Sequence, residues 1–258
     1  MMTNKELTFD EQRELQLEIL NEIDDCCNKY GIRYSLAFGT LLGAIRHKGY
    51  IPWDDDLDIM MPYRDMIRLR DSLNSNDIYF HDVDTDITYG NAFGNICSLK
   101  TFRKIGRSKE RGLGIDVYPI VKLPNEKEVE DAYFVKANKL QRKRERLLRL
   151  KQRLLKYFND FPVFGYSNTM QAFRNHLVSY DNMQSNRYYI IAGPLSRRDA
   201  LTYDFDLFER VIEVEFEGRM YKAIADYDFS LSKSYGDYMQ LPPVEERVPH
   251  HGQTYYWY

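Results

Sequence analysis

The sequence predicts an α+β fold in which helices flank a mixed β-sheet. In residues 8–122, apolar residues recur at helical spacing in some stretches and alternate in others, so helices and strands are interleaved. Residues 126–158 then contain neither glycine nor proline, which predicts one long helix. These two patterns indicate a sheet-based core that is followed by a helical segment.

The first half of the chain has clear element boundaries. Thr8 and Glu11 fit a capping box, and apolar residues then recur every four positions until Gly31, which predicts a helix closed by a glycine. Alternation over 32–38 predicts a strand, and we expect a short helix at 40–46 after it. Further elements are expected in this order: a strand at 56–61, a helix with Pro62 at its first position, and strands at 78–83, 93–102 and 113–120.

The second half adds helices and a strand pair. After the long helix we expect a helix at 169–180, alternating strands at 211–216 and 220–224 about Gly218, and a helix that opens at Asp226. No clear linker interrupts the sequence. We therefore expect one domain over 1–258, made of a core at 8–122, a helical insertion at 123–183, and C-terminal strands, helix and tail at 184–258.

Composition indicates a globular protein of a reducing compartment. The 258 residues are 43% hydrophobic, and 36 Lys and Arg against 39 Asp and Glu give a net charge of -3, which argues against a nucleic-acid partner. Cys26, Cys27 and Cys97 show no CxxC spacing, so no disulfide framework is expected. No stretch approaches the roughly 18 apolar residues of a membrane span. We expect a cytoplasmic protein.

The net charge hides an uneven distribution. Residues 136–156 hold ten Lys and Arg against one glutamate, a local charge of +9, so the rest of the chain carries -12. Leucines follow roughly one side of this segment, so it reads as an amphipathic basic helix. A charge run of this kind is usually a solvated face, and contact with an anionic partner is the alternative.

A run of carboxylates at 54–58 is the most informative feature. If the chain is extended there, Asp54, Asp56 and Asp58 lie on one strand face and apolar side chains on the other. Like charges at this spacing repel, unless a cation offsets them, and oxygen ligands favour Mg²⁺ or Mn²⁺. The alternative is a solvated turn or helix start. Because an apolar strand follows at once, we favour a metal site.

Two further features accompany the acidic run. A strand that ends in Gly39-Thr40 and turns into a helix offers close backbone approach, a hydroxyl and free N–H groups to a phosphate, and Arg46, His47 and Lys48 add positive charge. For Lys48, a solvated turn is equally consistent. Asp116 interrupts the apolar strand at 113–120, and a metal shared with the acidic run would offset the cost of burying it. The alternative is a partly exposed edge position.

The run YSLAFGTLLGAIRHKGYIPWDDDLDI at 34–59 resembles the signature of the LicD family. These are bacterial phosphocholine transferases, related to the fukutin-related proteins, in the polymerase-β-like nucleotidyltransferase superfamily. GIDVYP at 114–119 is similar to a later element of the family. The C-terminal part is also family-like, in YGDYM at 235–239, LPP at 241–243, Arg247, His250 and His251.

The resemblance implies a nucleotidyltransferase-like sheet and a metal-dependent transfer of phosphocholine. The donor would be CDP-choline or a related CDP-linked compound, and the acceptor a hydroxyl of a cell-surface glycan, teichoic acid or lipopolysaccharide precursor. The family's metal carboxylates correspond to Asp56, Asp58 and Asp116, and its phosphate loop to Gly39 and Thr40. Asp54 would assist the metal or act as the base that activates the acceptor.

Weaker expectations concern the remaining site residues. One of His250 and His251 reaches substrate phosphate in this interpretation, together with Arg247, although a tail histidine pair is ordinarily solvated. Trp53 is the candidate for an aromatic contact with choline. The basic helix at 136–156 would contact an anionic acceptor or the inner face of the membrane.

Three other functions remain open on the sequence. A nucleotidyltransferase that moves NMP from an NTP would use the same fold and carboxylates. An Asp-x-Asp glycosyltransferase is disfavoured, because the Gly-Thr turn precedes the acidic strand. The last is a nucleotide-binding or membrane-surface module without catalysis.

Overall fold

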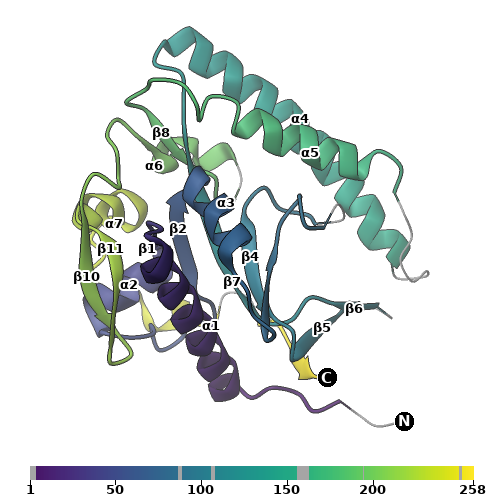
Figure 1. The fold of residues 1–258 in the computed structure, drawn as a ribbon, viewed down its shortest axis with the longest axis vertical. Coiled ribbons are helices and arrows are strands. Elements are labelled where there is room, and N and C mark those ends of the chain that lie inside the picture. The colour runs from purple at the N-terminus through teal and green to yellow at the C-terminus, as the bar shows by residue number, and fades with distance from the viewer. Residues whose placement is uncertain (1–3, 87–88, 106–107, 156–162, 194, 250–251) are drawn as a thin grey trace.

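The computed structural model describes residues 4–86, 89–105, 108–155, 163–193, 195–249 and 252–258. Its main element is a curled mixed sheet with the strand order β1-β2-β7-β4-β3, and helices pack around it, so the α+β class is confirmed (Figure 1). The strands of this path are β1 Ser35–Leu36, β2 Asp58–Pro62, β3 Ile78–His81, β4 Gly94–Ser98 and β7 Gly114–Lys122. Two strands missed by the sequence analysis, β8 Tyr188–Ile190 and β9 Thr202–Tyr203, extend the sheet from β7.

Strands β2 and β7 form the centre of the sheet and run parallel, whereas the other pairs are antiparallel. Their register sets Asp58 opposite Asp116. The expected strand at 56–61 therefore begins later, at Asp58, and its side chains do not alternate between core and solvent, because Met60 and Met61 are both buried. A strand covered on both faces reads as a continuous apolar run.

Helix α1 Phe9–Tyr30 confirms the predicted boundaries. Thr8 accepts a hydrogen bond from the Glu11 N–H, the Glu11 carboxylate accepts one from the Thr8 N–H, and Gly31 closes the helix in the left-handed conformation with φ 60°. The buried face of α1 includes Ile19 and Ile23, and it packs on the sheet near β4 and β7. The helix therefore covers β7, the strand that carries Asp116.

The expected strand at 32–38 is mostly wrong, because only Ser35–Leu36 pairs with β2. Helix α2 Phe38–His47 begins two residues before the expected one, with Ala37 as its extended N-cap. Phe38 adopts the left-handed φ of 43°, which turns the chain from strand to helix within one residue. Helix α3 Tyr63–Ser72, in contrast, begins one residue after the expected start, because Pro62 is its N-cap rather than its first residue.

The expected strand at 93–102 is two strands in two sheets. A turn after β4 leads into β5 Thr101–Ile105, which forms a second sheet in the order β12-β5-β6. Its other strands are β6 Ser108–Glu110 and β12 Tyr255–Trp257. The N-terminal segment joins this sheet through hydrogen bonds from the Leu7 N–H to the Tyr255 oxygen and from the Trp257 N–H to the Lys5 oxygen, each 2.9 Å long. Both chain ends consequently lie on the same side of the molecule (Figure 1).

The long basic helix is α4 Lys127–Leu155, and α5 Tyr166–Leu177 lies beside it across one side of the molecule (Figure 1). Residues 156–158 of the expected helix lie outside the described residues. The predicted strand pair is the hairpin of β10 Val211–Phe216 and β11 Arg219–Ile224, and Asp226 caps α7 Tyr227–Tyr235, as expected. The sequence analysis missed the short helices η1 Leu195–Arg197, α6 Arg198–Leu201 and η2 Val244–Glu246.

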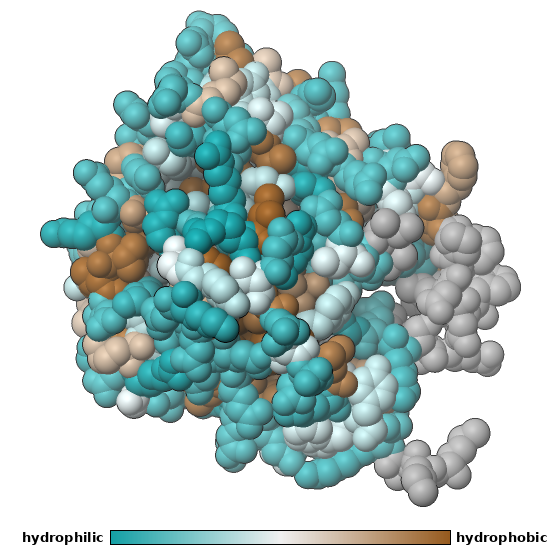
Figure 2. All heavy atoms as spheres, viewed as in Figure 1, coloured by the Kyte–Doolittle hydropathy of each residue, from teal (hydrophilic) through white to brown (hydrophobic). Residues whose placement is uncertain are grey.

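Hydrophilic side chains cover most of the visible face, with hydrophobic ones in small separate groups (Figure 2). In the part of the chain that the structure describes, no helix has both the length and the apolar composition needed to cross a membrane. The apolar side chains instead form a large core that includes Ile59 of β2 and Val117 of β7.

Replacing Thr8 by alanine tests the N-terminal cap of α1. The change removes the hydroxyl that accepts from the Glu11 N–H, so we expect the free energy of unfolding to fall by about 1 kcal/mol. Urea denaturation followed by circular dichroism measures this change. Thr8→Ser keeps the hydroxyl and should stay close to the parent, and an equal loss in both variants would contradict the capping role.

Candidate active site

A cavity of about 840 Å³ opens between the start of α2, the acidic loop before β2, and the segment that leads into η2. Tyr118 of β7, Arg197 of η1 and Tyr235 of α7 also contribute to its wall. Six residues that the sequence analysis selected line this cavity: Gly39, Arg46, Trp53, Asp54, Asp56 and Asp58. Residues that are far apart in the sequence are thus brought together at one end of β2.

Asp58 and Asp116 start the central parallel strand pair and lie directly opposite each other. Asp116 faces a smaller cavity of about 90 Å³, and Asp56 lines both this cavity and the large one. The Tyr118 hydroxyl donates a 3.4 Å hydrogen bond to Asp116 Oδ2, and Asn95 Nδ2 donates one of 2.7 Å to Asp116 Oδ1. The three carboxylates therefore meet where the two cavities adjoin.

The electrostatics of these carboxylates are unfavourable without a cation. Burial, followed by repulsion from Asp56, Asp116 and Asp54, raises the pKa of Asp58 well above its ordinary value. Burial also raises the pKa of Asp116, although Asn95 opposes this. Asp58 Oδ1 is buried without a hydrogen-bond partner among the described residues. A hard divalent cation fits this set of oxygen donors, since it supplies the missing partner and offsets the repulsion.

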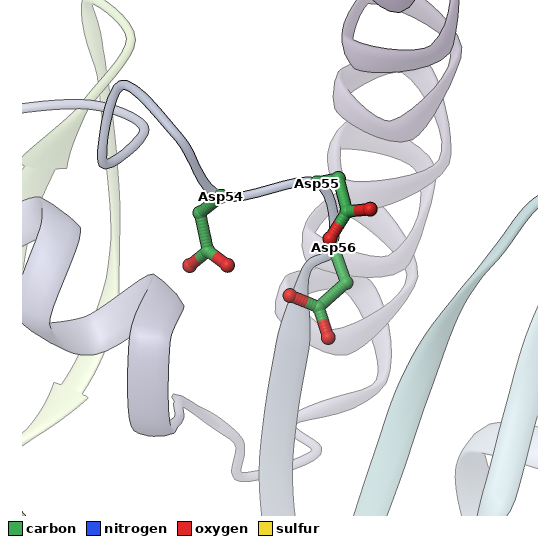
Figure 3. A group of neighbouring side chains, drawn as sticks. All are labelled: Asp54, Asp55 and Asp56. Carbon is green, nitrogen blue, oxygen red and sulfur yellow. The ribbon is translucent and has the colours of Figure 1, made fainter. Parts of the chain in front are cut away.

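The acidic loop adds a second group of carboxylates. Oxygen atoms of Asp54, Asp55 and Asp56 lie within 4.8 Å of one another. All three side chains project from the loop before β2 (Figure 3). Asp55 Oδ2 accepts a 2.9 Å hydrogen bond from the Gly252 N–H, so this carboxylate ties the C-terminal segment to the loop. The chain before Asp58 is not a strand, and the expected alternation of the three carboxylates is wrong for Asp54 and Asp56.

Gly39 gives Asp54 its position. A Cβ atom built on Gly39 would lie 2.5 Å from Asp54 Oδ2, so only glycine lets this carboxylate rest against the first turn of α2. Two side chains of α1 hold the loop through its backbone carbonyl oxygens. Arg13 Nη2 donates to the carbonyl oxygens of Ile51 and Asp54, and Gln16 Nε2 to that of Asp55. Sequence reasoning missed Arg13 and Gln16, because they act on backbone atoms about 40 positions away.

Thr40 is buried and supports β2. Its hydroxyl oxygen accepts a 2.8 Å hydrogen bond from the Asp58 N–H, which fixes the residue that begins the strand. The hydroxyl proton is still available to another acceptor. Thr40 therefore connects the turn into α2 with the carboxylate strand, a role that its sequence context did not indicate.

Comparison with known proteins supports the resemblance. Residues 31–163 match the model of the family described as LicD/FKTN/FKRP, nucleotidyltransferase domain. The chain is 30% identical, over 262 aligned positions, to the lipopolysaccharide cholinephosphotransferase LicD of Haemophilus influenzae, and the alignment covers 98% of the chain and 99% of that protein. The chain belongs to the LicD family. An uncharacterised protein of Rickettsia prowazekii is 38% identical over 80 residues, which cover 31% of the LicD-family chain and 28% of the relative.

The three positive residues expected near the phosphates, Arg46, His47 and Lys48, lie in different surroundings in the LicD-family chain. Arg46 lines the large cavity and donates to the Tyr238 oxygen at 2.6 Å, and burial lowers its pKa. His47 packs its ring against the edge of Trp53, with ring centroids 6.4 Å apart, and burial lowers its pKa. Lys48 ends α2 in the left-handed conformation, is exposed, and is not among the residues that line the cavity. The solvated-turn alternative describes Lys48 better.

Trp53 lines the cavity, but a cation already lies on its ring. The Arg247 guanidinium is 5.5 Å from the Trp53 ring centroid, and Arg247 Nε donates to the Pro242 oxygen. A quaternary ammonium would compete with Arg247 for a face of this ring. His250 and His251 lie outside the described residues.

Two cavity residues were not selected from the sequence. Tyr118 follows Asp116 by two positions on the same strand, so its direction was readable from the alternation of β7. Arg197 is exposed in the cavity wall, and the sequence around it carries no signal that separates it from its neighbour Arg198. Arg197 adds a positive charge to the wall of the cavity that these carboxylates also line.

Replacing Gly39 by alanine tests the contact with Asp54. The added methyl group would displace the Asp54 carboxylate or the first turn of α2, so we expect activity to fall by about 100-fold while the chain stays folded. Steady-state kinetics and circular dichroism measure the two effects. Gly218→Ala lies at a hairpin turn with φ 76°, where alanine is strained, so it controls for a loss of stability at a glycine outside the site. Unchanged activity of Gly39→Ala would contradict the proposed packing.

Replacing Asp58 by asparagine tests the raised pKa. Between the ordinary aspartate pKa of about 4 and the raised value, the folded chain keeps a proton that the unfolded chain has lost, so stability falls as pH rises. With EDTA at pH 7 we expect Asp58→Asn to melt about 2–4 °C above the parent. The difference should fade as the pH falls towards 4. Equal melting temperatures at pH 7 would contradict the raised pKa, and Asp71→Asn is the exposed control.

Proposed function

We propose that the chain is a LicD-type phosphocholine transferase, which moves phosphocholine from CDP-choline to a hydroxyl of a lipopolysaccharide or another cell-surface glycan. The observation that carries this proposal is the pairing of Asp116 with Asp58, which lines the large cavity. The chain is also similar over nearly its full length to a lipopolysaccharide cholinephosphotransferase. A teichoic acid remains an alternative acceptor.

Asp56, Asp58 and Asp116 would hold Mg²⁺ or Mn²⁺. The raised pKa of Asp58 and its unpartnered Oδ1 support this assignment, and Asp54 is close enough to Asp56 to assist. When bound, the cation would neutralise charge on the pyrophosphate oxygens of the donor and on the departing nucleotide. The protein's own contribution is to keep four carboxylates together at the cost of stability.

Asp54 is the candidate base of the transfer. The acceptor oxygen attacks the phosphorus that carries choline, the bond from this phosphorus to the CMP oxygen breaks, and the acceptor proton passes to a carboxylate. Because Asp54 rests on Gly39 beside the first turn of α2, the free N–H groups of that turn are close to the same place. Arg46 and Arg197 add positive charge to the walls of the cavity for the phosphates of the donor.

The basic face of α4 would bring the protein to its acceptor. Its charged side chains are exposed along the helix, and those of Lys136, Lys139, Arg142, Lys143, Arg146, Arg149 and Arg153 lie on this face. An anionic glycan precursor or the inner face of the membrane is a suitable partner for such a surface. This proposal assigns the protein to the cytoplasm, with a peripheral membrane contact and without a nucleic-acid partner.

A nucleotidyltransferase is the second candidate, because the family model that matches residues 31–163 is described as a nucleotidyltransferase domain. It would attack the phosphorus next to the nucleoside and release pyrophosphate from an NTP. A non-catalytic binding module would leave the repulsion between Asp58 and Asp116 without a purpose, and is the weaker alternative.

Product analysis tests the proposed reaction. With CDP-choline, acceptor and Mg²⁺ we expect CMP and a phosphocholine-modified acceptor, and EDTA should abolish both. Asp56→Ala and Asp58→Ala should lower the rate by at least about 1,000-fold, because they remove charge stabilisation from the transfer. Asp71→Ala, a change to an exposed aspartate of α3, should retain the parent rate. Pyrophosphate release from CTP without CMP release from CDP-choline would favour the nucleotidyltransferase instead.

A further inference from the structure

Besides the two cavities at the carboxylates, a cavity of about 230 Å³, which we call the second cavity, lies between α4, α5 and residues Ile191, Gly193 and Leu195. It adjoins the large cavity, because Gly193 lines both. Phe93 lines the second cavity, and its ring centroid is 4.7 Å from that of Tyr118, which lines the large one. A ligand that extends past Gly193 from the site of transfer would enter this space.

Arg144 of α4 is the positive group of the second cavity. Its Nε atom is buried without a hydrogen-bond partner among the described residues, and burial lowers the pKa of its guanidinium. Within the part of the chain that the structure describes, Arg144 also forms no ion pair, in contrast to Arg70, Arg187 and Arg219, each of which contacts at least two carboxylates. The charge of Glu145 acts on Arg144 but makes no ion pair with it, so the partly buried guanidinium is only partly compensated. An anionic ligand in direct contact would offset the remaining cost.

Gln141 and Glu145, two other polar residues of the cavity, are hydrogen-bonded to each other. Gln141 Nε2 donates a 2.9 Å hydrogen bond to Glu145 Oε1, and Gln141 Oε1 accepts the Leu195 N–H at 3.2 Å. Glu145 faces the same cavity and keeps a further carboxylate oxygen for a hydroxyl group. Phe173 lies beneath the Arg144 guanidinium, which is 5.6 Å from its ring centroid. An aromatic surface, a hydroxyl acceptor and an arginine together match a sugar that carries an anionic group.

We propose that the second cavity binds an anionic sugar of the acceptor glycan, and that Arg144 contacts the phosphate or carboxylate of this sugar. This inference rests on the proposed transferase function and names the part of the acceptor that the site recognises. The choline group of the donor does not suit this cavity, because Arg144 would repel its quaternary ammonium. The cavity therefore distinguishes acceptors by their charge rather than selecting the donor.

Acceptor kinetics test this role of Arg144. The parent, Arg144→Gln, Arg144→Lys and the control Arg210→Gln, at an exposed arginine before β10, are compared on native lipopolysaccharide with CDP-choline and Mg²⁺. We expect Arg144→Gln to lower kcat/KM for the acceptor by about 10-fold or more, mainly through KM, with a smaller loss in Arg144→Lys. CMP release without acceptor, melting temperature and the Arg210→Gln rates should stay at parent values.

Modified acceptors identify the anionic group. Dephosphorylated lipopolysaccharide and carboxyl-reduced lipopolysaccharide are compared with the native acceptor. Whichever treatment removes the recognised group should lower the parent to the level of Arg144→Gln and leave that variant unchanged. If Arg144→Gln loses as much activity on acceptor that lacks both groups as on native acceptor, or loses CMP release without acceptor, the inference is wrong.

A binding measurement separates the inference from the proposed function. A hexose phosphate, a hexuronate and a neutral hexose are added in the presence of EDTA, and the melting temperature is recorded. We expect one of the two anionic sugars to raise the melting temperature of the parent more than that of Arg144→Gln, and the neutral hexose to have no effect. Equal shifts in both proteins would overturn the inference. Absence of CMP release from CDP-choline in the parent would instead contradict the transferase function.

Discussion

Carboxylates at the start of the central parallel strands repel one another, and the surrounding elements hold them together against this repulsion. Asp58 and Asp116 lie in register on β2 and β7, and Asp56 lies beside both. Like charges in a buried position destabilise the fold, so separate elements must hold them. Helix α1 fixes the acidic loop through backbone carbonyls, Thr40 fixes the first residue of β2, and Gly39 leaves space for a fourth carboxylate. Functional sites commonly keep such unfavourable arrangements.

Short-range signals in the sequence predicted the elements that they control. The capping box at Thr8, the glycine that closes α1 and the hairpin around Gly218 depend on neighbouring residues, and all three are confirmed. The acidic cluster was found because its residues are close in sequence. By contrast, the start of β2 depends on a hydrogen bond from the Asp58 N–H to the hydroxyl oxygen of Thr40, 18 positions away. The second sheet depends on residues 255–257. No local pattern encodes such contacts, so these parts were not predictable from the sequence alone.

Positive charge on α4 serves two different environments. Most of its Lys and Arg side chains are exposed, which is the ordinary condition of a charged helix face, whereas Arg144 turns towards the cavity beside α5. The sequence gives these residues the same charge. Only the packing distinguishes Arg144, which forms no ion pair with any described residue, from the lysines and arginines that are exposed to water. The same reasoning applies to Trp53. Its aromatic ring would suit the choline group, but the Arg247 guanidinium already lies over that ring. Side-chain chemistry therefore defines the candidates, and their neighbours decide between them.

The pairing of the C-terminal segment with β5 has a consequence for synthesis. Strand β12 completes the second sheet, and the Gly252 N–H reaches Asp55 of the acidic loop, nearly 200 positions earlier. Contacts of such long sequence separation form slowly, and chains fold from the N-terminus as they leave the ribosome. The hydrogen bond from the Gly252 N–H to Asp55 of the acidic loop can therefore form only after residues 252–258 are present. A nascent chain that already contains every proposed metal ligand would still lack part of the support for the acidic loop until residues 252–258 have been synthesised and folded.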